Sequence, residues 1–259
     1  MRIAFFDSGV GGLTVLKQAL AALPNEEYLY YADTRNVPYG VKTTAEVREL
    51  VFHAVEFLVR QNIDALVVAC NTATSAAIGD LRTRYAFPII GMEPAVKPAV
   101  AKNTGKKILV CATSLTLNES KLDTLIAKLD TQHKVERLEL DRLVTFAETF
   151  AFDEPAVRSY LLGKMAGVRW DQYETIVLGC THFIFYRDLI QELAGPGISV
   201  IDGNAGTVRR LVQLVGARAS TSAPRGPRIV FFSSGEAESP ERVARLTSLL
   251  NGTAQSRST

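Results

Sequence analysis

Short apolar runs alternate with helical patterns along most of the chain. Runs rich in β-branched and aromatic residues predict strands at 2–6, 27–31, 65–69, 88–91, 107–111, 135–140, 175–179, 198–202 and 228–232. Several of the segments between them carry apolar residues at three- and four-residue spacing, which is typical of helices. Strands separated by helices indicate a parallel sheet with crossover helices, so the pattern predicts an α/β fold.

Two helix starts carry capping signals. Thr43, followed three residues later by Glu46, has the form of a capping box and predicts a helix over residues 44–60. Ser239 and Pro240 have the form of an N-cap followed by a first-turn proline, which predicts the start of the last helix. Residues 216–227 are expected to form a surface loop, and the polar residues 251–259 a frayed end.

The order of the strand ends repeats in the second part of the chain at a nearly constant offset. The repeat predicts two similar parallel-sheet α/β lobes related by pseudo-symmetry, with the active site in the cleft between them. The first lobe is expected to comprise residues 1–96 and 208–259, and the second residues 97–207. The paired positions and their offsets are Ile3 and Ile108 (105), Asp33 and Asp141 (108), Cys70 and Cys180 (110), and Gly91 and Asp202 (111).

Composition and charge narrow the class of protein. Hydrophobic residues make up 47% of the 259 residues, so a packed core is expected rather than disorder. The formal charge of +2 gives no electrostatic reason to expect nucleic acid or a membrane surface as a partner. The sequence enters a strand at once, without a signal peptide pattern, and no apolar run approaches the roughly 18 residues that span a bilayer. We therefore expect a cytoplasmic protein, and its three cysteines argue against a disulfide framework.

Two of the cysteines close buried-looking strands and precede polar turns. Cys70 is followed by Asn71 and Thr72, and Cys180 by Thr181 and His182. The carboxyl ends of parallel strands are where α/β proteins build their sites, and a helix start there is expected to lower a thiol pKa from about 8.5. Two thiols facing one substrate suit the removal of a proton from one face of a carbon and its return to the other. The alternative is that both are small core residues, as we expect for the third cysteine, Cys111.

The first turn, Asp7-Ser8-Gly9-Val10-Gly11-Gly12, is a second candidate site segment. Its glycines would let the backbone pass close to a ligand, and the following helix start would favour a carboxylate. The turn is not a dinucleotide fingerprint, because Thr14 stands where that pattern requires glycine. Asp7 would hold a substrate ammonium or orient Cys70; alternatively, it caps the next helix.

His182 and Glu148 are further candidates for proton transfer. His182 would share a proton with Cys180 or with the substrate, or else cap a helix. Glu148 lies among apolar residues, either as a buried acid that supports His182 or as an exposed helix position. A zinc site would need paired cysteine ligands, and a cysteine hydrolase would leave the second thiol without a role. We therefore expect no metal. We also expect no cofactor, because the sequence shows no cofactor-binding motif and no lysine in an obvious Schiff-base setting.

Five segments closely resemble the bacterial glutamate racemases of the cofactor-independent aspartate/glutamate racemase superfamily. They follow the order of that family and span much of the chain, although Ile184 stands where its members commonly have proline. The segments are FDSGVGGLTV (6–15), YYADTRNVPYG (30–40), VVACNTATSAA (67–77), GMEPAVKPA (91–99) and VLGCTHF (177–183).

The resemblance implies a role for each matching residue. Cys70 would exchange the α-proton on the D-glutamate face and Cys180 on the L-glutamate face, assisted by Asp7, His182 and Glu148. It also implies a homodimer that needs no cofactor and supplies D-glutamate for peptidoglycan. The implied substrate contacts are Asp7, Ser8, Pro38, Tyr39, Gly40, Asn71, Thr72, Thr74, Thr116, Thr181 and His182.

Two other functions stay open at this point. One keeps the fold and changes the substrate, as in an aspartate or hydantoin racemase or a one-cysteine decarboxylase relative. The other is a two-lobed amino-acid-binding protein without catalysis, although binding alone gives no reason for a thiol on each side. Exchange of the α-proton with solvent distinguishes the two.

Overall fold

The computed structural model of the chain describes residues 1–130, 133–216 and 228–252. All nine predicted strands are present within these ranges, in two separate sheets. Of the predicted loop at 216–227 and the predicted frayed end at 251–259, residues 217–227 and 253–259 lie outside the described residues. Asn251 is the last residue of the final helix, so the prediction of a frayed end is wrong at that residue.

The first sheet has six strands in the order β10-β9-β2-β1-β3-β4, and only the β10–β9 pair is antiparallel. The second sheet is fully parallel, with the order β6-β5-β7-β8. The first-sheet strands are β1 (Arg2–Asp7), β2 (Glu27–Ala32), β3 (Ala65–Val68), β4 (Ile89–Gly91), β9 (Arg228–Ser233) and β10 (Glu236–Ala237). The second-sheet strands are β5 (Lys107–Ala112), β6 (Val135–Glu139), β7 (Tyr173–Leu178) and β8 (Ser199–Asp202).

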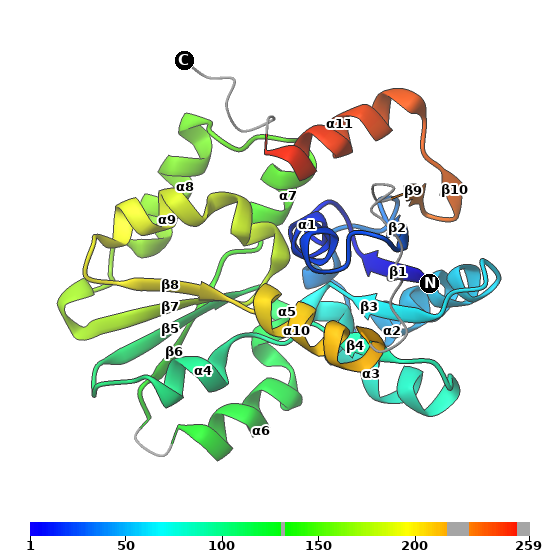
Figure 1. Cartoon of the computed structure of the whole chain (residues 1–259). Coiled ribbons are helices and arrows are strands. Elements are labelled where there is room, and N and C mark those ends of the chain that lie inside the picture. Colours follow the sequence, from blue (N-terminus) through cyan, green and yellow to red (C-terminus); the bar gives the residue numbers. More distant parts are fainter. Residues whose placement is uncertain (131–132, 217–227, 253–259) are drawn as a thin grey trace.

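The repeat predicted from the strand ends is confirmed by the topology. The order β2-β1-β3-β4 in the first sheet recurs as β6-β5-β7-β8 in the second. The arrows of β1 and β8 point toward each other across the middle of the molecule (Figure 1), so the carboxyl ends of both sheets face one interface. The chain returns to the first sheet after β8, because β9 pairs with β2. The lobe boundaries at residues 96, 97, 207 and 208 stay a prediction.

Helices cover both faces of each sheet. The two predicted helix starts are confirmed: Thr43 and Glu46 form a capping box, and Ser239 accepts a hydrogen bond from the amide of Arg242. The helices around the first sheet are α1 (Leu13–Ala22), α2 (Thr44–Val59), α3 (Asn71–Arg84), α10 (Asn204–Val215) and α11 (Pro240–Asn251). Those around the second are α4 (Val96–Ala101), α5 (Ser114–Asn118), α6 (Ser120–Leu129), α7 (Arg142–Glu148), α8 (Pro155–Met165) and α9 (Arg187–Ala194). Short 3₁₀ helices are η1 (Tyr39–Val41), η2 (Trp170–Gln172) and η3 (Thr181–Tyr186).

Side chains of β1 alternate between two core clusters, as the pleat of a strand requires. Ile3 and Phe5 point into a cluster with α1, α10 and α11, whereas Ala4 and Phe6 point into one with α2 and α3. The first cluster continues into the second lobe through α7, α8 and α9. The two lobes therefore share one apolar core beside the interface where their strands end.

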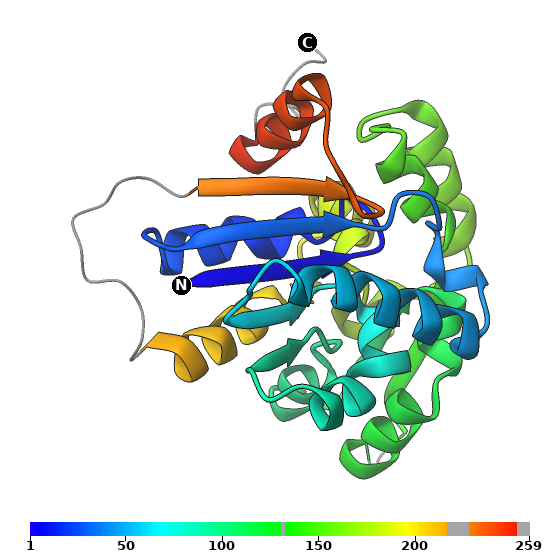
Figure 2. The same ribbon diagram turned by 90° about the vertical axis from the view of Figure 1, so that its right-hand side faces the viewer.

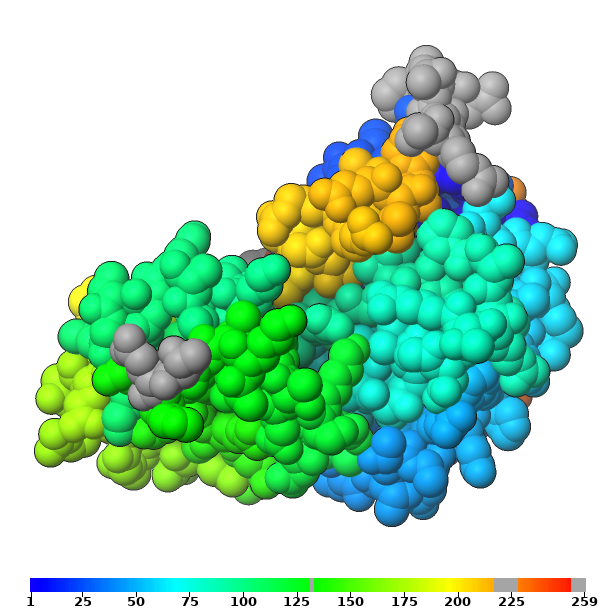
Figure 3. All heavy atoms as spheres, turned by 90° about the horizontal axis from the view of Figure 1, so that it is seen from below, coloured from blue at the N-terminus to red at the C-terminus, as the bar shows by residue number. Residues whose placement is uncertain are grey.

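In Figure 2 the arrows of β1, β2 and β9 run in one direction, and Figure 3 shows the two lobes meeting along a seam.

Candidate active site

Cys70 lies two residues after the end of β3 and caps the start of α3. Its sulfur accepts a hydrogen bond from the amide of Ala73 at 3.4 Å, and the hydroxyl oxygen of Ser8 lies 3.7 Å from it. Burial, followed by the negative charge of Asp7, raises the pKa of Cys70 to about 12, although the Ala73 amide opposes this. The expectation of a lowered pKa is therefore wrong for Cys70, because desolvation of the thiolate outweighs the helix start.

Cys180 occupies the equivalent place after β7, with a different partner. Its sulfur lies 3.8 Å from Nδ1 of His182, and the other ring nitrogen of His182 lies 2.7 Å from the carboxylate of Glu148. Burial lowers the pKa of His182, but its hydrogen bonds with Cys180 and Glu148 outweigh burial, so the pKa lies well above its usual value. The raised pKa favours the protonated form of His182, whose ring lies between the sulfur of Cys180 and the carboxylate of Glu148.

Asp7 is fully buried at the end of β1, between the two lobes. One carboxylate oxygen accepts the amide N–H of Gly9 at 2.8 Å, and the other accepts the hydroxyl of Thr181 at 3.2 Å. Burial raises its pKa from 3.8 to about 6, and the positive charge of His182 partly opposes the shift. The alternative role of Asp7 as a helix cap is wrong, because α1 begins after Gly12 without a side-chain cap.

Glu148 ends α7 and joins the two lobes. The same oxygen that contacts His182 also accepts the amide N–H of Val10 at 2.7 Å. Its side chain is only 13% exposed, so the structure supports the buried acid beside His182 rather than the exposed helix position. Three elements far apart in sequence thus converge on one carboxylate.

The glycine turn after β1 makes room for these second-lobe side chains. A Cβ atom at Gly9 would lie 1.8 Å from Oε1 of Glu148, and one at Gly11 would lie 2.5 Å from Nδ1 of His182. The groups that approach these glycines are the carboxylate and imidazole of the other lobe. The approach of a ligand to the same turn stays a prediction. Glycine is required because no larger residue leaves this space free.

Three buried threonine hydroxyls meet at the lobe interface. The hydroxyl oxygen of Thr72 lies 3.1 Å from that of Thr113 and 3.0 Å from that of Thr116, and the latter two are 3.0 Å apart. Thr72 and Thr116 were expected here, whereas Thr113 was missed. The repeat held the signal, because the offset of 105 that relates β1 to β5 also relates Ser8 to Thr113.

The Pro38–Gly40 segment reaches the second lobe through its backbone. The carbonyl oxygen of Gly40 accepts the hydroxyl of Ser114 at 3.3 Å, and a Cβ atom at Gly40 would lie 2.6 Å from Cβ of Thr113. The phenol of Tyr39 donates instead to the carboxylate of Asp33 at 2.6 Å. The structure therefore ties the Tyr39 side chain to the first lobe and brings the Gly40 backbone to the interface.

The side chains of Asn71 and Thr74 form hydrogen bonds with backbone groups, among them those of Met92, the residue after β4. The amide of Asn71 donates to the carbonyl oxygen of Met92 at 3.3 Å. The hydroxyl of Thr74 donates to the carbonyl oxygen of Val68 at 3.1 Å and accepts the amide N–H of Met92 at 3.0 Å. Both residues thus fix the chain after β4 close to the start of α3.

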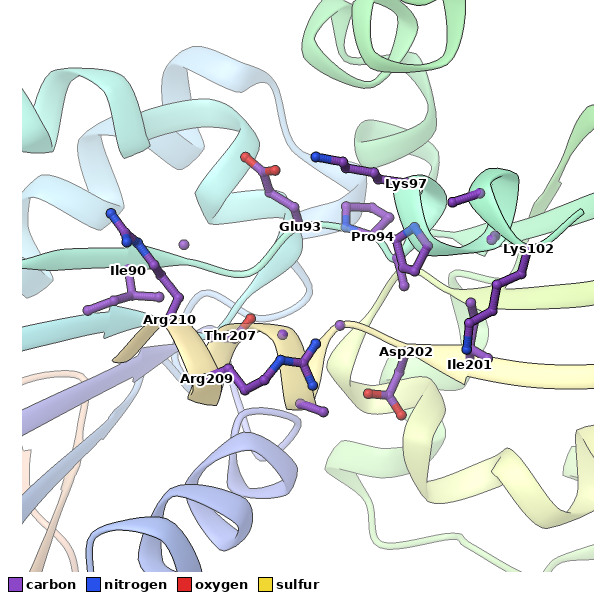
Figure 4. Close-up of a pocket in the computed structure, with 18 of the residues that line it drawn as sticks. Ile90, Glu93, Pro94, Lys97, Lys102, Ile201, Asp202, Thr207, Arg209 and Arg210 are labelled. Carbon is purple, nitrogen blue, oxygen red and sulfur yellow. The ribbon is translucent and has the colours of Figure 1, made fainter. Parts of the chain in front are cut away.

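A large cavity of about 1230 Å³ opens elsewhere, between β4, α4, β8 and α10. Lys97, Lys102 and Arg209 line it together with Glu93 and Asp202 (Figure 4). None of its lining residues is a cysteine or a histidine, and none belongs to the thiol site. The cavity is therefore separate from the buried interface that holds the two thiols.

The described residues contain neither a metal-binding cluster nor a membrane-spanning helix. No group of three or more His, Cys, Asp or Glu side chains in that part of the chain is arranged to hold a metal ion. No helix in the same part is long and apolar enough to cross a membrane.

Comparisons with known proteins agree with this geometry. A glutamate racemase of Halothermothrix orenii is 52% identical over 91% of this chain and 94% of that protein. Glutamate racemase 2 of Bacillus subtilis is 47% identical over 99% of this chain and 98% of that protein. A solved structure of a glutamate racemase isoform from Bacillus anthracis, 29% identical, superimposes with a TM-score of 0.83 over 96% of this chain and 93% of that one.

The family model for Asp/Glu/hydantoin racemases matches residues 8–211. The match begins at the turn after β1 and ends within α10, so it includes both thiols, Glu148 and His182. The chain therefore belongs to the Asp/Glu/hydantoin racemase family.

Proposed function

We propose that the protein is a glutamate racemase, an isomerase that interconverts L- and D-glutamate without a cofactor by using Cys70 and Cys180 as paired acid–base groups. One observation carries the proposal: two buried thiols follow equivalent strands, β3 and β7, of two similar sheets. The thiols are close enough that charge on Cys180 raises the pKa of Cys70. The choice of glutamate rests on the relatives, which carry that name at 52% and 47% identity.

The different partners of the two thiols suggest how one turnover starts. Burial holds Cys70 as a neutral thiol, since its pKa is raised to about 12. The protonated ring of His182 can donate its Nδ1–H to the sulfur of Cys180, which suits Cys180 to act as the base. Cys180 would then take the α-proton of L-glutamate, and the Cys70 thiol would deliver its proton to the opposite face. The product would be D-glutamate, with the two sulfurs left in exchanged protonation states.

The carbanion formed between these steps needs electrostatic stabilisation. The site residues are almost fully buried, so fixed dipoles would replace water around the developing charge. We propose that the hydroxyls of Thr72, Thr113 and Thr116 donate to a substrate carboxylate, because the three meet at the lobe interface and Thr72 is two residues from Cys70. Asp7, Ser8, Asn71 and Thr181 remain proposed substrate contacts.

Three wider statements are inferred from the family alone. They are the supply of D-glutamate for peptidoglycan biosynthesis, a homodimeric state and a cytoplasmic location. Sedimentation of the purified protein at several concentrations would test the dimer directly.

The first experiment follows optical rotation and α-deuterium uptake in D₂O with no added cofactor. We expect L- and D-glutamate to lose rotation and to gain deuterium at the α-carbon, and aspartate to do neither. Exchange of aspartate alone would keep the chemistry and overturn the substrate. Binding of glutamate without any exchange would overturn catalysis and support an amino-acid-binding protein.

Substitution of Gly9 by alanine tests the close approach of the two lobes. The added Cβ would lie 1.8 Å from the Glu148 carboxylate, so that carboxylate must leave Val10 and His182. We expect kcat/KM for glutamate to fall by about 10- to 100-fold, since misplacement near a reacting centre has effects of this size. Gly79→Ala is the matched control, because Gly79 lies inside α3 with open space around it. It should keep full activity and gain about 0.5–1 kcal/mol of stability. Equal activity of the two variants would contradict the prediction.

A further inference from the structure

Helix α7 ends at Glu148, and the chain turns in an unusual way two residues later. Phe150 has a φ of +62°, in the left-handed region that side chains other than glycine rarely adopt. The amide of Phe150 donates to the carbonyl of Ala147 at 2.9 Å, and that of Ala151 donates to the carbonyl of Phe146 at 2.8 Å. These two bonds form a Schellman motif, whose left-handed position is usually occupied by glycine.

Two arginines of α11 cover the ring of Phe150. The guanidinium carbon of Arg245 lies 3.6 Å from the ring centroid, and that of Arg242 lies 4.9 Å from it. Both distances are within the range of cation–π attraction. Helix α11 follows the strands β9 and β10 of the first sheet and packs on α1, whereas Phe150 follows α7 of the second lobe. Figure 1 shows α11 extending from above α1 toward α7.

We propose that Phe150 and Arg245 form a clamp between the lobes that positions Glu148 for racemisation. This inference rests on the proposed function. Glu148 and Phe150 are fixed to the same helix end, while the glycine turn and α11 both adjoin α1. The clamp therefore holds the end of α7 at the distance at which the Glu148 carboxylate reaches the Val10 amide and His182 together.

Because Phe150 adopts a left-handed conformation, its replacement by glycine can distinguish the clamp from a role in ending the helix. If Phe150 only ends the helix, glycine would serve as well or better, because glycine adopts this conformation without strain. If the ring is needed for the clamp, Phe150→Gly keeps the helix end and loses the link to α11. Arg245→Met removes the cation from the other side of the same contact and leaves the α7 backbone unchanged.

The experiment compares Phe150→Gly, Arg245→Met and the double variant with wild type. We expect kcat to fall by about 10-fold or more for Phe150→Gly and by about two- to fivefold for Arg245→Met, with smaller changes in KM. The double variant should be no worse than Phe150→Gly, since Phe150→Gly already removes the contact that Arg245→Met removes. Arg84→Met is the matched control, because Arg84 makes the same kind of contact with Phe52, at 5.3 Å, in the first lobe.

Two further measurements keep the test independent of stability and of the substrate. Displacement of Glu148 removes one of the hydrogen bonds that raise the pKa of His182, so the alkaline limb of the activity profile should move to lower pH. Hydrogen exchange at the Val10 amide should become faster in both clamp variants and stay unchanged in Arg84→Met. This second signal needs no turnover, so it tests the clamp even if wild type does not racemise glutamate. Unchanged kcat together with unchanged Val10 exchange in Phe150→Gly would overturn the clamp.

Discussion

Replacing Cys70 or Cys180 by serine is expected to lower the rate of glutamate racemisation by about a thousandfold or more. Each thiol has its own set of partners, Ser8 and the Ala73 amide for Cys70, and His182 for Cys180. Neither sulfur can therefore take over the work of the other. A serine hydroxyl is a much weaker acid than a thiol. It therefore neither ionises to act as the base nor donates a proton to the carbanion as readily as a thiol does.

The third cysteine provides the matched control for this prediction. Cys111 is as deeply buried, in the middle of the second sheet, but its sulfur has no side-chain hydrogen bond within the described part of the chain. Cys111→Ala should keep racemisation close to wild type and lower only the melting temperature, because it leaves a small cavity. Racemisation near the wild-type rate in either serine variant would rule out the two-thiol mechanism, provided that circular dichroism shows an intact fold.

Asp7→Asn is expected to make the protein more stable at neutral pH and much less active. The pKa of Asp7 is about 6 in the folded chain against 3.8 ordinarily, so the folded state binds the proton more tightly than the unfolded state does. Its favourable contribution is present below pH 3.8 and is lost as the pH rises through about 6. At higher pH the buried charge costs about 3 kcal/mol, which an uncharged asparagine of similar shape avoids.

Thermal unfolding at two pH values measures this effect. Asp7→Asn should melt about 5–10 °C above wild type near pH 8 and show little difference near pH 4. Racemisation should fall by about 100-fold or more, because the charge between Cys70 and Thr181 is gone. Asp80→Asn is the control: Asp80 forms an exposed ion pair with Arg48 at 3.0 Å, and such pairs contribute little. Equal melting temperatures of Asp7→Asn and wild type at both pH values would show that the buried charge of Asp7 does not lower the stability of the folded state.

Asp7 lowers stability while it supports activity, and the same holds for the other buried polar groups of the site. A buried carboxylate, a buried imidazolium and two buried thiols are unfavourable for folding unless each is paired. The shared apolar core beside the site and the bonds across the interface hold these groups in place. Burial of these groups lowers the stability of the interface. It also excludes water, so their charges interact more strongly with a bound substrate.

Local sequence patterns determined most of the fold. The nine strands were predicted because apolar runs and turn residues report on neighbours within a few positions. The helix caps and strand-end thiols are likewise local signals, and the repeat of strand ends correctly predicted two lobes with the same strand order. Strand β10 was not predicted, because its two residues, Glu236 and Ala237, are too few to show a period.

The tertiary structure alone decided how the site residues are paired and charged. Glu148 meets Val10 across 138 positions of sequence, and Thr181 meets Asp7 across 174. No local pattern reports on such distances, so the sequence named these residues without assigning their partners. The direction of the Cys70 pKa was predicted wrongly for the same reason: a helix start is visible in the sequence, whereas the depth of burial depends on both lobes. The sequence by itself determined which groups stand at the strand ends, and the packing of one lobe against the other decided their protonation.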